Sequence, residues 1–150
     1  MSKKAIILIF ILILSPVLIY FLWPSDESRI KKLIKEGAAA VEKEEVDNVM
    51  AKVSFNYQDD RGMAYVLIKK ILTEQFKSLS GIKIEYENLK IEVKEKLANA
   101  EFDLRVIATI GNQTGYITGD LKTPARVKLF LEKEHATWLV IKTEGTQTSF

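Results

Sequence analysis

The side chains best suited to chemistry lie in one short polar segment and one charged turn. Asp59 and Asp60 stand together just before Arg61, and paired carboxylates perform general acid–base catalysis when an apolar pocket shifts their pKa values. Their position ahead of a predicted helix favours a simpler role, which is capping the N-terminus of that helix. His135, the only histidine, lies in a charged segment that is typical of an exposed turn. We therefore assign no catalytic residue.

Three tyrosines are candidates for the lining of a pocket. Tyr57 alternates with polar neighbours, Tyr65 lies on the apolar stripe of a predicted helix, and Tyr86 lies on the apolar side of a predicted strand. Tyrosine rings can line an apolar pocket with their hydroxyl groups at its mouth, although burial in a core is their commoner place. Together with Asp59 and Asp60 they form our set of candidate pocket residues.

Composition excludes several classes of function. The chain has no cysteine, which excludes disulfides, thiolate zinc sites and thiol catalysis. No cluster of oxygen ligands and no phosphate-binding glycine motif is evident, so we expect neither a metal nor a cofactor. Lys3 and Lys4 are two of the 22 basic residues. The remaining basic residues match the 20 acidic ones, so nothing favours nucleic-acid binding.

The strongest signal is an uncharged apolar segment over residues 5–23. A helix of that length spans about 28 Å, close to the hydrocarbon thickness of a bilayer. Tyr20 and Trp23 at its far end suit the membrane interface, and lipid tolerates Pro16 within it. A cleaved signal peptide and a buried globular helix are the alternatives, but the segment is long and lacks a small-residue cleavage site. We expect an uncleaved transmembrane helix.

Charges around this segment favour one orientation slightly. Residues 1–4 form a short basic N-terminus, which normally stays in the cytoplasm, and long domains translocate largely regardless of their charge. We therefore expect a single-pass protein of a bacterial inner membrane, with a periplasmic or extracytoplasmic domain. Residues 24–28 form a short junction, in which Pro24 ends the membrane helix and Ser25 or Asp26 caps the next one.

Beyond the junction, apolar residues recur with the period of a helix. This period predicts a helix with one buried face over residues 30–41, a short helix over 46–53, and a third helix over 65–79. Ser80–Gly81 is the predicted end of the third helix. Residues 54–58 alternate in polarity and predict a short strand between the last two helices.

From residue 82 onward the apolar period changes to two. Short connections between these segments predict an antiparallel sheet, and helices followed by strands predict an α+β fold. We expect the tail, residues 145–150, to be frayed. The predicted strands cover residues 82–86, 89–93, 102–110, 127–131 and 138–141, with turns at Ala98–Asn99 and at residues 134–136 and a glycine-containing connection over 111–119.

This order of elements resembles the nuclear transport factor 2-like superfamily. Residues 40–50 resemble its first-to-second helix segment, residues 53–62 resemble the strand and turn of membrane-anchored or secreted bacterial members without an assigned activity, and residues 138–141 resemble its closing strand. The resemblance covers residues 28–144, and we place the domain at 29–144. It implies a cystatin-like cone in which about three helices pack on a curved antiparallel sheet, often with a pocket at the open end.

The resemblance does not fix a function, because such relatives include isomerases, dehydratases and epoxide hydrolases as well as binding and assembly modules. We expect a membrane-anchored, non-catalytic domain that binds a ligand or a protein partner, with a homodimer through the sheet face as one form of partner. An acid–base enzyme of the isomerase or hydrolase type predicts ionisable side chains inside the pocket. An accessory subunit of an envelope membrane complex predicts that the anchor cannot be exchanged for another helix.

Overall fold

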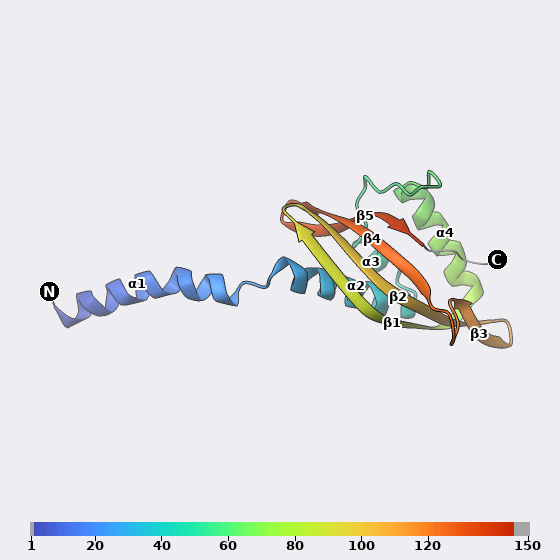
Figure 1. Cartoon of the computed structure of the whole chain (residues 1–150), viewed down its shortest axis with the longest axis horizontal. Coiled ribbons are helices and arrows are strands. Elements are labelled where there is room, and N and C mark those ends of the chain that lie inside the picture. Colours follow the sequence, from blue (N-terminus) through green and yellow to red (C-terminus); the bar gives the residue numbers. More distant parts are fainter. Residues whose placement is uncertain (1, 146–150) are drawn as a thin grey trace.

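An apolar helix, α1 (Lys3–Leu22), leads into the domain without packing against it (Figure 1). The computed structural model describes residues 2–145, so the predicted frayed tail lies outside the described residues except for Gly145. Helix α1 is long and apolar enough to cross a membrane, and its most apolar window is 0% buried. The buried-helix alternative is therefore wrong. A membrane anchor and a signal sequence both fit this helix.

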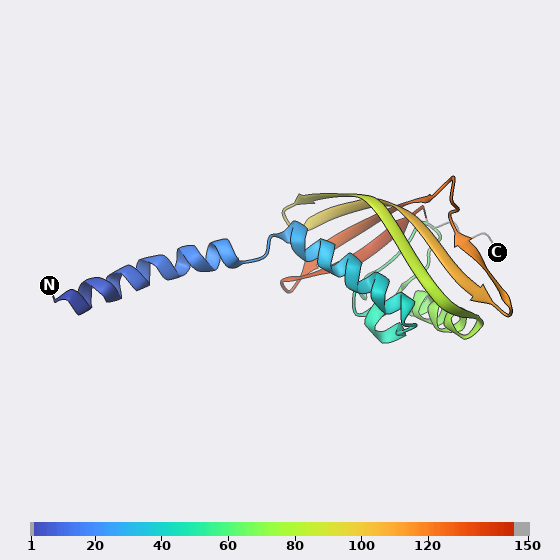
Figure 2. The ribbon, with the colours of Figure 1, turned by 90° about the horizontal axis from the view of Figure 1, so that it is seen from below.

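Helix α2 (Asp26–Glu42) begins three residues earlier than the predicted domain boundary. Ser25 caps it, because its hydroxyl oxygen accepts a hydrogen bond from the Ser28 backbone N–H at 3.1 Å. Ile30, Leu33 and Ile34 form its buried face, as the helical period predicts. Figure 2 shows α2 lying along the concave face of the curved sheet.

Helices α3 (Val46–Met50) and α4 (Tyr65–Ser78) confirm the second and third predicted helices, but two details differ. No residue of α4 is buried. The apolar residues from which this helix was predicted are therefore at least partly exposed to solvent and do not lie in the core. The chain passes directly from Ser78 into the first strand, ahead of the predicted end at Ser80–Gly81. The predicted strand over residues 54–58 is wrong, since only isolated bridges at Val53 and Gln58 occur there.

Within residues 2–145, five antiparallel strands form one sheet. In the order β1-β2-β4-β5, the long strand β2 lies between β1 and β4, and β3 pairs with the far end of β2. The two predicted runs over 82–86 and 89–93 join into β1, with a register shift at Asn88, whose φ is 57°. The strands are β1 (Leu79–Lys94), β2 (Leu97–Ile110), β3 (Gln113–Thr118), β4 (Ala125–Glu134) and β5 (Thr137–Glu144).

The β1–β2 turn lies at Glu95–Lys96, so the predicted turn at Ala98–Asn99 is wrong. Ala98 pairs with Val93 inside the ladder and is buried in the core cluster that also contains Ile30 and Ile34 of α2. Ala98 is therefore a core residue of the sheet and not part of a chain reversal. The predicted connection over 111–119 contains a hairpin with β3, and the turn at residues 134–136 is confirmed.

Three segments meet at the end of the domain nearest α1. The Asp26 carboxylate accepts hydrogen bonds from Lys133 Nζ at 2.8 Å and from the indole Nε1 of Trp138 at 2.9 Å. The Lys133 backbone N–H donates to the Lys96 carbonyl at 2.8 Å. The start of α2, the β4–β5 hairpin and the β1–β2 turn are thus joined beside the junction.

Replacing Asp26 with asparagine should remove a pH-dependent part of the stability. Hydrogen bonds from Lys133 and then Trp138 hold the pKa of Asp26 below its ordinary value of 3.8. The carboxylate therefore stabilises the fold above that value, and this stabilisation is lost as the pH falls through the lower folded-state pKa. About a third of the side chain is exposed, so we expect a loss of only about 1 kcal/mol at pH 7.

Chemical denaturation of the full chain at pH 7 and at pH 3 measures this effect. The difference between wild type and Asp26→Asn should shrink at the lower pH. Glu27→Gln is the matched control, because Glu27 is exposed and pairs with Lys31 within the same helix. An Asp26→Asn loss that is equal at both pH values contradicts the prediction.

Candidate ligand-binding site

An apolar cavity of 260 Å³ lies between α2 and the concave face of the sheet. Its volume is just below the usual range for sites that hold drug-sized ligands, which is roughly 300–1,000 Å³. We call it the apolar cavity. Its walls come from α2, α3, β1, β2, β4 and β5, and they include Leu33, Gly37, Ala38, Ile84, Phe102, Val127 and Leu129.

Small side chains on α2 leave this space unfilled. A Cβ atom added at Gly37 would meet nothing within 4 Å, and Ala38 follows it on the cavity wall. Glycine inside a helix costs about 1 kcal/mol relative to alanine. The sequence therefore keeps the space open although filling it would favour the helix.

Few polar groups reach the lining. They are Tyr86, Lys52 and Thr143, and among the described residues no carboxylate and no histidine lines the cavity. The Tyr86 ring meets the Phe102 ring edge-on, with 5.8 Å between the ring centroids. The lining thus combines a large apolar surface with a few hydrogen-bonding groups, which is the usual character of a binding pocket.

Tyr57 lies next to this lining rather than in it. Tyr57 is 6% exposed and belongs to the core cluster, which includes the cavity residues Phe102 and Val127. Burial raises the pKa of the Tyr57 phenol above its ordinary value of 10. The phenol therefore stays protonated at neutral pH.

Asp59 and Asp60 do not line the cavity and do not cap α4. Asp59 Oδ1 accepts hydrogen bonds from the backbone N–H groups of Arg61 and Met63, both at 2.9 Å, and so shapes its own loop. Asp60 is exposed and pairs with Lys142 at 2.8 Å. The residue at the N-cap of α4 is Ala64, without a side-chain hydrogen bond. The predicted capping role is therefore wrong.

The two residues still to be placed, Tyr65 and His135, both lie outside the lining of the apolar cavity. Tyr65 lies at the start of α4 and packs on Phe55, with 4.6 Å between the ring centroids. His135 is exposed in the β4–β5 turn. Of the five candidate pocket residues, Tyr86 lines the apolar cavity, and Tyr57, Asp59, Asp60 and Tyr65 lie outside its lining.

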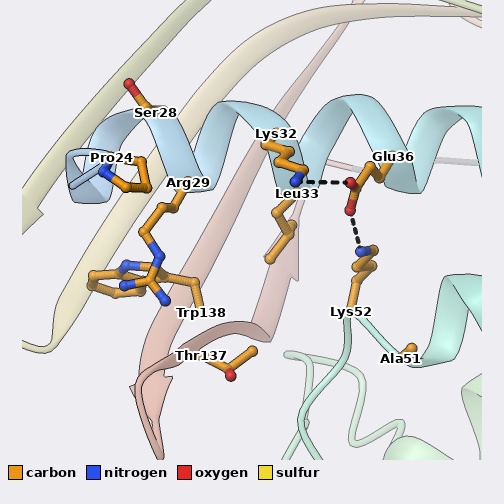
Figure 3. A pocket seen from close by; sticks show the side chains of 10 residues that line it. All are labelled: Pro24, Ser28, Arg29, Lys32, Leu33, Glu36, Ala51, Lys52, Thr137 and Trp138. Carbon is orange, nitrogen blue, oxygen red and sulfur yellow. Dashed lines mark hydrogen bonds and ion pairs between the residues drawn. The ribbon is translucent and has the colours of Figure 1, made fainter. Parts of the chain in front are cut away.

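A second hollow of 410 Å³ lies beside the first turns of α2, and we call it the charged cleft (Figure 3). Arg29 and Lys32 reach it from α2, and Lys52 reaches it from the segment after α3. Glu36 pairs with Lys52 at 2.5 Å and with Lys32 at 3.7 Å. These pairs, chiefly the one with Lys52, hold the pKa of Glu36 below its ordinary value.

Sequence reasoning missed the charged cleft. The spacing of Arg29, Lys32 and Glu36 places these side chains on one helix face, and this was the one available signal. Their partner Lys52 and the wall residue Trp138 come from distant parts of the chain. No local pattern predicts that meeting.

The outer face of the sheet is charged where β1, β2 and β4 run together. Arg126 pairs with Asp103 at 3.0 Å and with Glu101 at 3.2 Å, and Arg105 pairs with Glu87 at 2.8 Å. A partner docking there would meet ion pairs rather than an apolar patch. The expected homodimer through the sheet face stays a prediction.

The sequence matches no protein-family model and no curated protein. Solved structures do resemble the chain. A protein of unknown function with a cystatin-like fold from Nostoc punctiforme is 20% identical, with a TM-score of 0.62 over 79% of this chain and 87% of that one. A nuclear transport factor 2-like protein of unknown function from Pseudomonas putida is 16% identical, with a TM-score of 0.61 over 83% of this chain and 93% of that one.

A third similar structure is named as a candidate scytalone dehydratase, from Novosphingobium aromaticivorans. It is 14% identical and has a TM-score of 0.67 over 81% of this chain and 84% of that one. Identities this low establish the fold alone. The domain that follows α1 has the cystatin-like fold of nuclear transport factor 2-like proteins.

Proposed function

We propose that this protein is a membrane-anchored binding domain that holds an apolar ligand in the cavity between α2 and the sheet. One observation carries the proposal: the cavity is open, almost wholly apolar, and lined by no carboxylate or histidine among the described residues. A non-catalytic site needs apolar walls and a few orienting groups, and Tyr86 and Thr143 supply such groups.

The position of α1 supports a place at a membrane. A helix of 20 residues spans about 30 Å, which equals the hydrocarbon thickness of a bilayer. We propose a cytoplasmic N-terminus, because the short segment before the apolar run, residues 1–4, is basic, with the domain on the periplasmic or extracytoplasmic side of an inner membrane. Protease added to spheroplasts should digest the domain, whereas an intact domain that is cleaved only after lysis contradicts this orientation.

A dehydratase-type enzyme is the second candidate, since one similar structure carries that name. Acid–base chemistry needs a proton donor and a proton acceptor within reach of the substrate. Tyr86 and Lys52 are the ionisable groups of the cavity lining among the described residues. Because neither a carboxylate nor a histidine joins them, the lining favours binding.

Methyl NMR of the full chain in lipid nanodiscs tests the binding proposal, with 1-octanol as the apolar probe. Methyl signals of the cavity residues Ile84, Leu104 and Val127 should shift on titration, whereas those of the exposed residues Ile110 and Leu121 should not. Equal shifts in both groups would indicate nonspecific partitioning and would overturn the proposal.

A pair of substitutions at one position provides the matched control. Gly37→Leu places a side chain in the empty space of the cavity and should weaken octanol binding at least tenfold. Gly37→Ala adds one methyl group, improves helix propensity by about 0.5–1 kcal/mol, and should retain binding. Retention of wild-type binding by Gly37→Leu would contradict the assignment of the cavity.

A further inference from the structure

The apolar cavity and the charged cleft share a wall. Leu33 and Lys52 line both. Lys52 extends from the segment after α3 toward Glu36 on α2, and its side chain is only partly exposed. A molecule that filled the cavity would therefore meet an ammonium group at the boundary with the cleft.

Positive charge exceeds negative charge in the charged cleft. Arg29, Lys32 and Lys52 line it, whereas Glu36 is its only carboxylate among the described residues. Figure 3 shows the ammonium groups of Lys32 and Lys52 both directed at the Glu36 carboxylate. Lys32 is 74% exposed, and its distance to Glu36 is 3.7 Å. Its ammonium group is therefore free to turn toward an anion at little cost.

The cleft also begins where the membrane helix ends. Pro24 lines it, two residues after the end of α1, and Ser28, Arg29 and Lys32 follow on the first turns of α2. The polar headgroup layer extends roughly 5–7 Å beyond the hydrocarbon, and a helix rises 1.5 Å per residue. With α1 in the bilayer, the end of the cleft at Pro24 thus lies in the headgroup layer of the adjacent leaflet, and the cleft extends from there along α2 away from the membrane.

We infer that the ligand is an amphiphile whose apolar chain occupies the cavity and whose anionic phosphate group lies in the charged cleft. The inference rests on the proposed function of the cavity and adds the chemical class of the ligand. Lys32 and Lys52 would supply charge-assisted hydrogen bonds to the phosphate oxygens. Arg29 would add positive charge to the wall, since its guanidinium is already held by Asp26 at 3.6 Å and by the Ala136 carbonyl. Glu36, the carboxylate of the cleft lining, would exchange its lysine partners for solvent.

Three probes separate the contribution of the ligand's apolar tail to binding from that of its phosphate group. The full chain in nanodiscs of uncharged lipid is titrated with octyl phosphate, with 1-octanol and with inorganic phosphate, while the methyl signals of Leu33 and Val53 report binding. We expect octyl phosphate to bind about tenfold tighter than octanol, since two or more charge-assisted hydrogen bonds are added. Inorganic phosphate should not shift these signals at the same concentrations.

Neighbouring lysines on α2 provide the matched variants. Lys32→Gln and the charge reversal Lys32→Glu should reduce the advantage of octyl phosphate over octanol several-fold. Lys31→Gln makes the same charge change one residue away, where Lys31 pairs with Glu27 outside the cleft, and should keep the advantage. Both lysines are exposed, so neither change threatens the fold.

The possible outcomes distinguish failure of the phosphate site from failure of the proposed function of the apolar cavity. Equal binding of octyl phosphate and octanol overturns the phosphate site while leaving the apolar cavity intact. Equal effects of Lys31→Gln and Lys32→Gln also overturn it, because they would reflect general surface charge. If inorganic phosphate is the one probe that binds tightly, the inference of an amphiphilic ligand is overturned, and a soluble anion is indicated instead. Failure of every probe removes the proposed function as well.

Discussion

Lysine at both Ile11 and Ile13 should move the protein from the membrane pellet to the soluble fraction. Both residues lie near the middle of α1, and both are exposed in the structure. A lysine at the centre of a membrane helix costs about 2.5–3.5 kcal/mol, so two cost roughly 5–7 kcal/mol. A change of that size alters a partition equilibrium by about four orders of magnitude.

Carbonate-washed membranes and immunoblotting of both fractions measure the distribution. Tyr20→Lys is the control, because a lysine near the end of a membrane helix can extend its ammonium group into the headgroup layer. That variant should remain in the pellet. Retention of the Ile11→Lys, Ile13→Lys double variant after the wash would show that α1 is not what holds the protein there.

The intact mass of the membrane-bound protein separates an anchor from a signal sequence. An uncleaved anchor predicts the full mass of 17.1 kDa. A mature protein that lacks α1 would instead be released by the wash without any substitution. The two results differ by the mass of the N-terminal segment, so one measurement distinguishes them.

Leu131→Ala should cause the largest loss of stability within the domain, about 3–5 kcal/mol. Leu131 lies in the middle of β4, pairs with Ala98 and Val140, and is 0% exposed. It borders neither the apolar cavity nor the charged cleft, so its removal leaves a void in the packed core. Small domains are stable by only about 5–15 kcal/mol.

Thermal unfolding of the full chain in detergent measures this loss. The midpoint should fall by roughly 10–20 °C. Leu121→Ala deletes the same atoms at a position that is 76% exposed and should change the free energy of unfolding by less than about 0.5 kcal/mol. Equal effects of the two substitutions would contradict the position of Leu131 in the core.

The sequence by itself determined the regular elements, because each depends on residues close together in the chain. The uncharged run forms α1, and the helical period of Ile30, Leu33 and Ile34 identifies the buried face of α2. The Ser25 cap depends on a residue only three positions away. Alternating polarity likewise identified most of the sheet, since successive side chains of a strand face opposite sides.

Errors occurred where one local pattern fits two structures. Ala98 and Asn99 are small and polar enough for a turn, but Ala98 pairs with both neighbouring strands and belongs to the core cluster. The carboxylate of Asp59 can cap a helix or close a loop, and its geometry with Arg61 and Met63 selects the loop. For Ala98 the outcome depended on strands that are distant in the sequence, and for Asp59 it depended on the path of the local backbone.

Only the tertiary structure decided where a ligand could bind. The apolar cavity exists because small residues of α2 face the concave side of a sheet that follows them in the sequence. The charged cleft exists because Lys52 and Trp138 fold back onto Arg29 and Lys32. Local sequence indicates which side chains share a helix face or a strand face. A cavity is the space that remains after distant elements have packed, so no local sequence pattern predicts it.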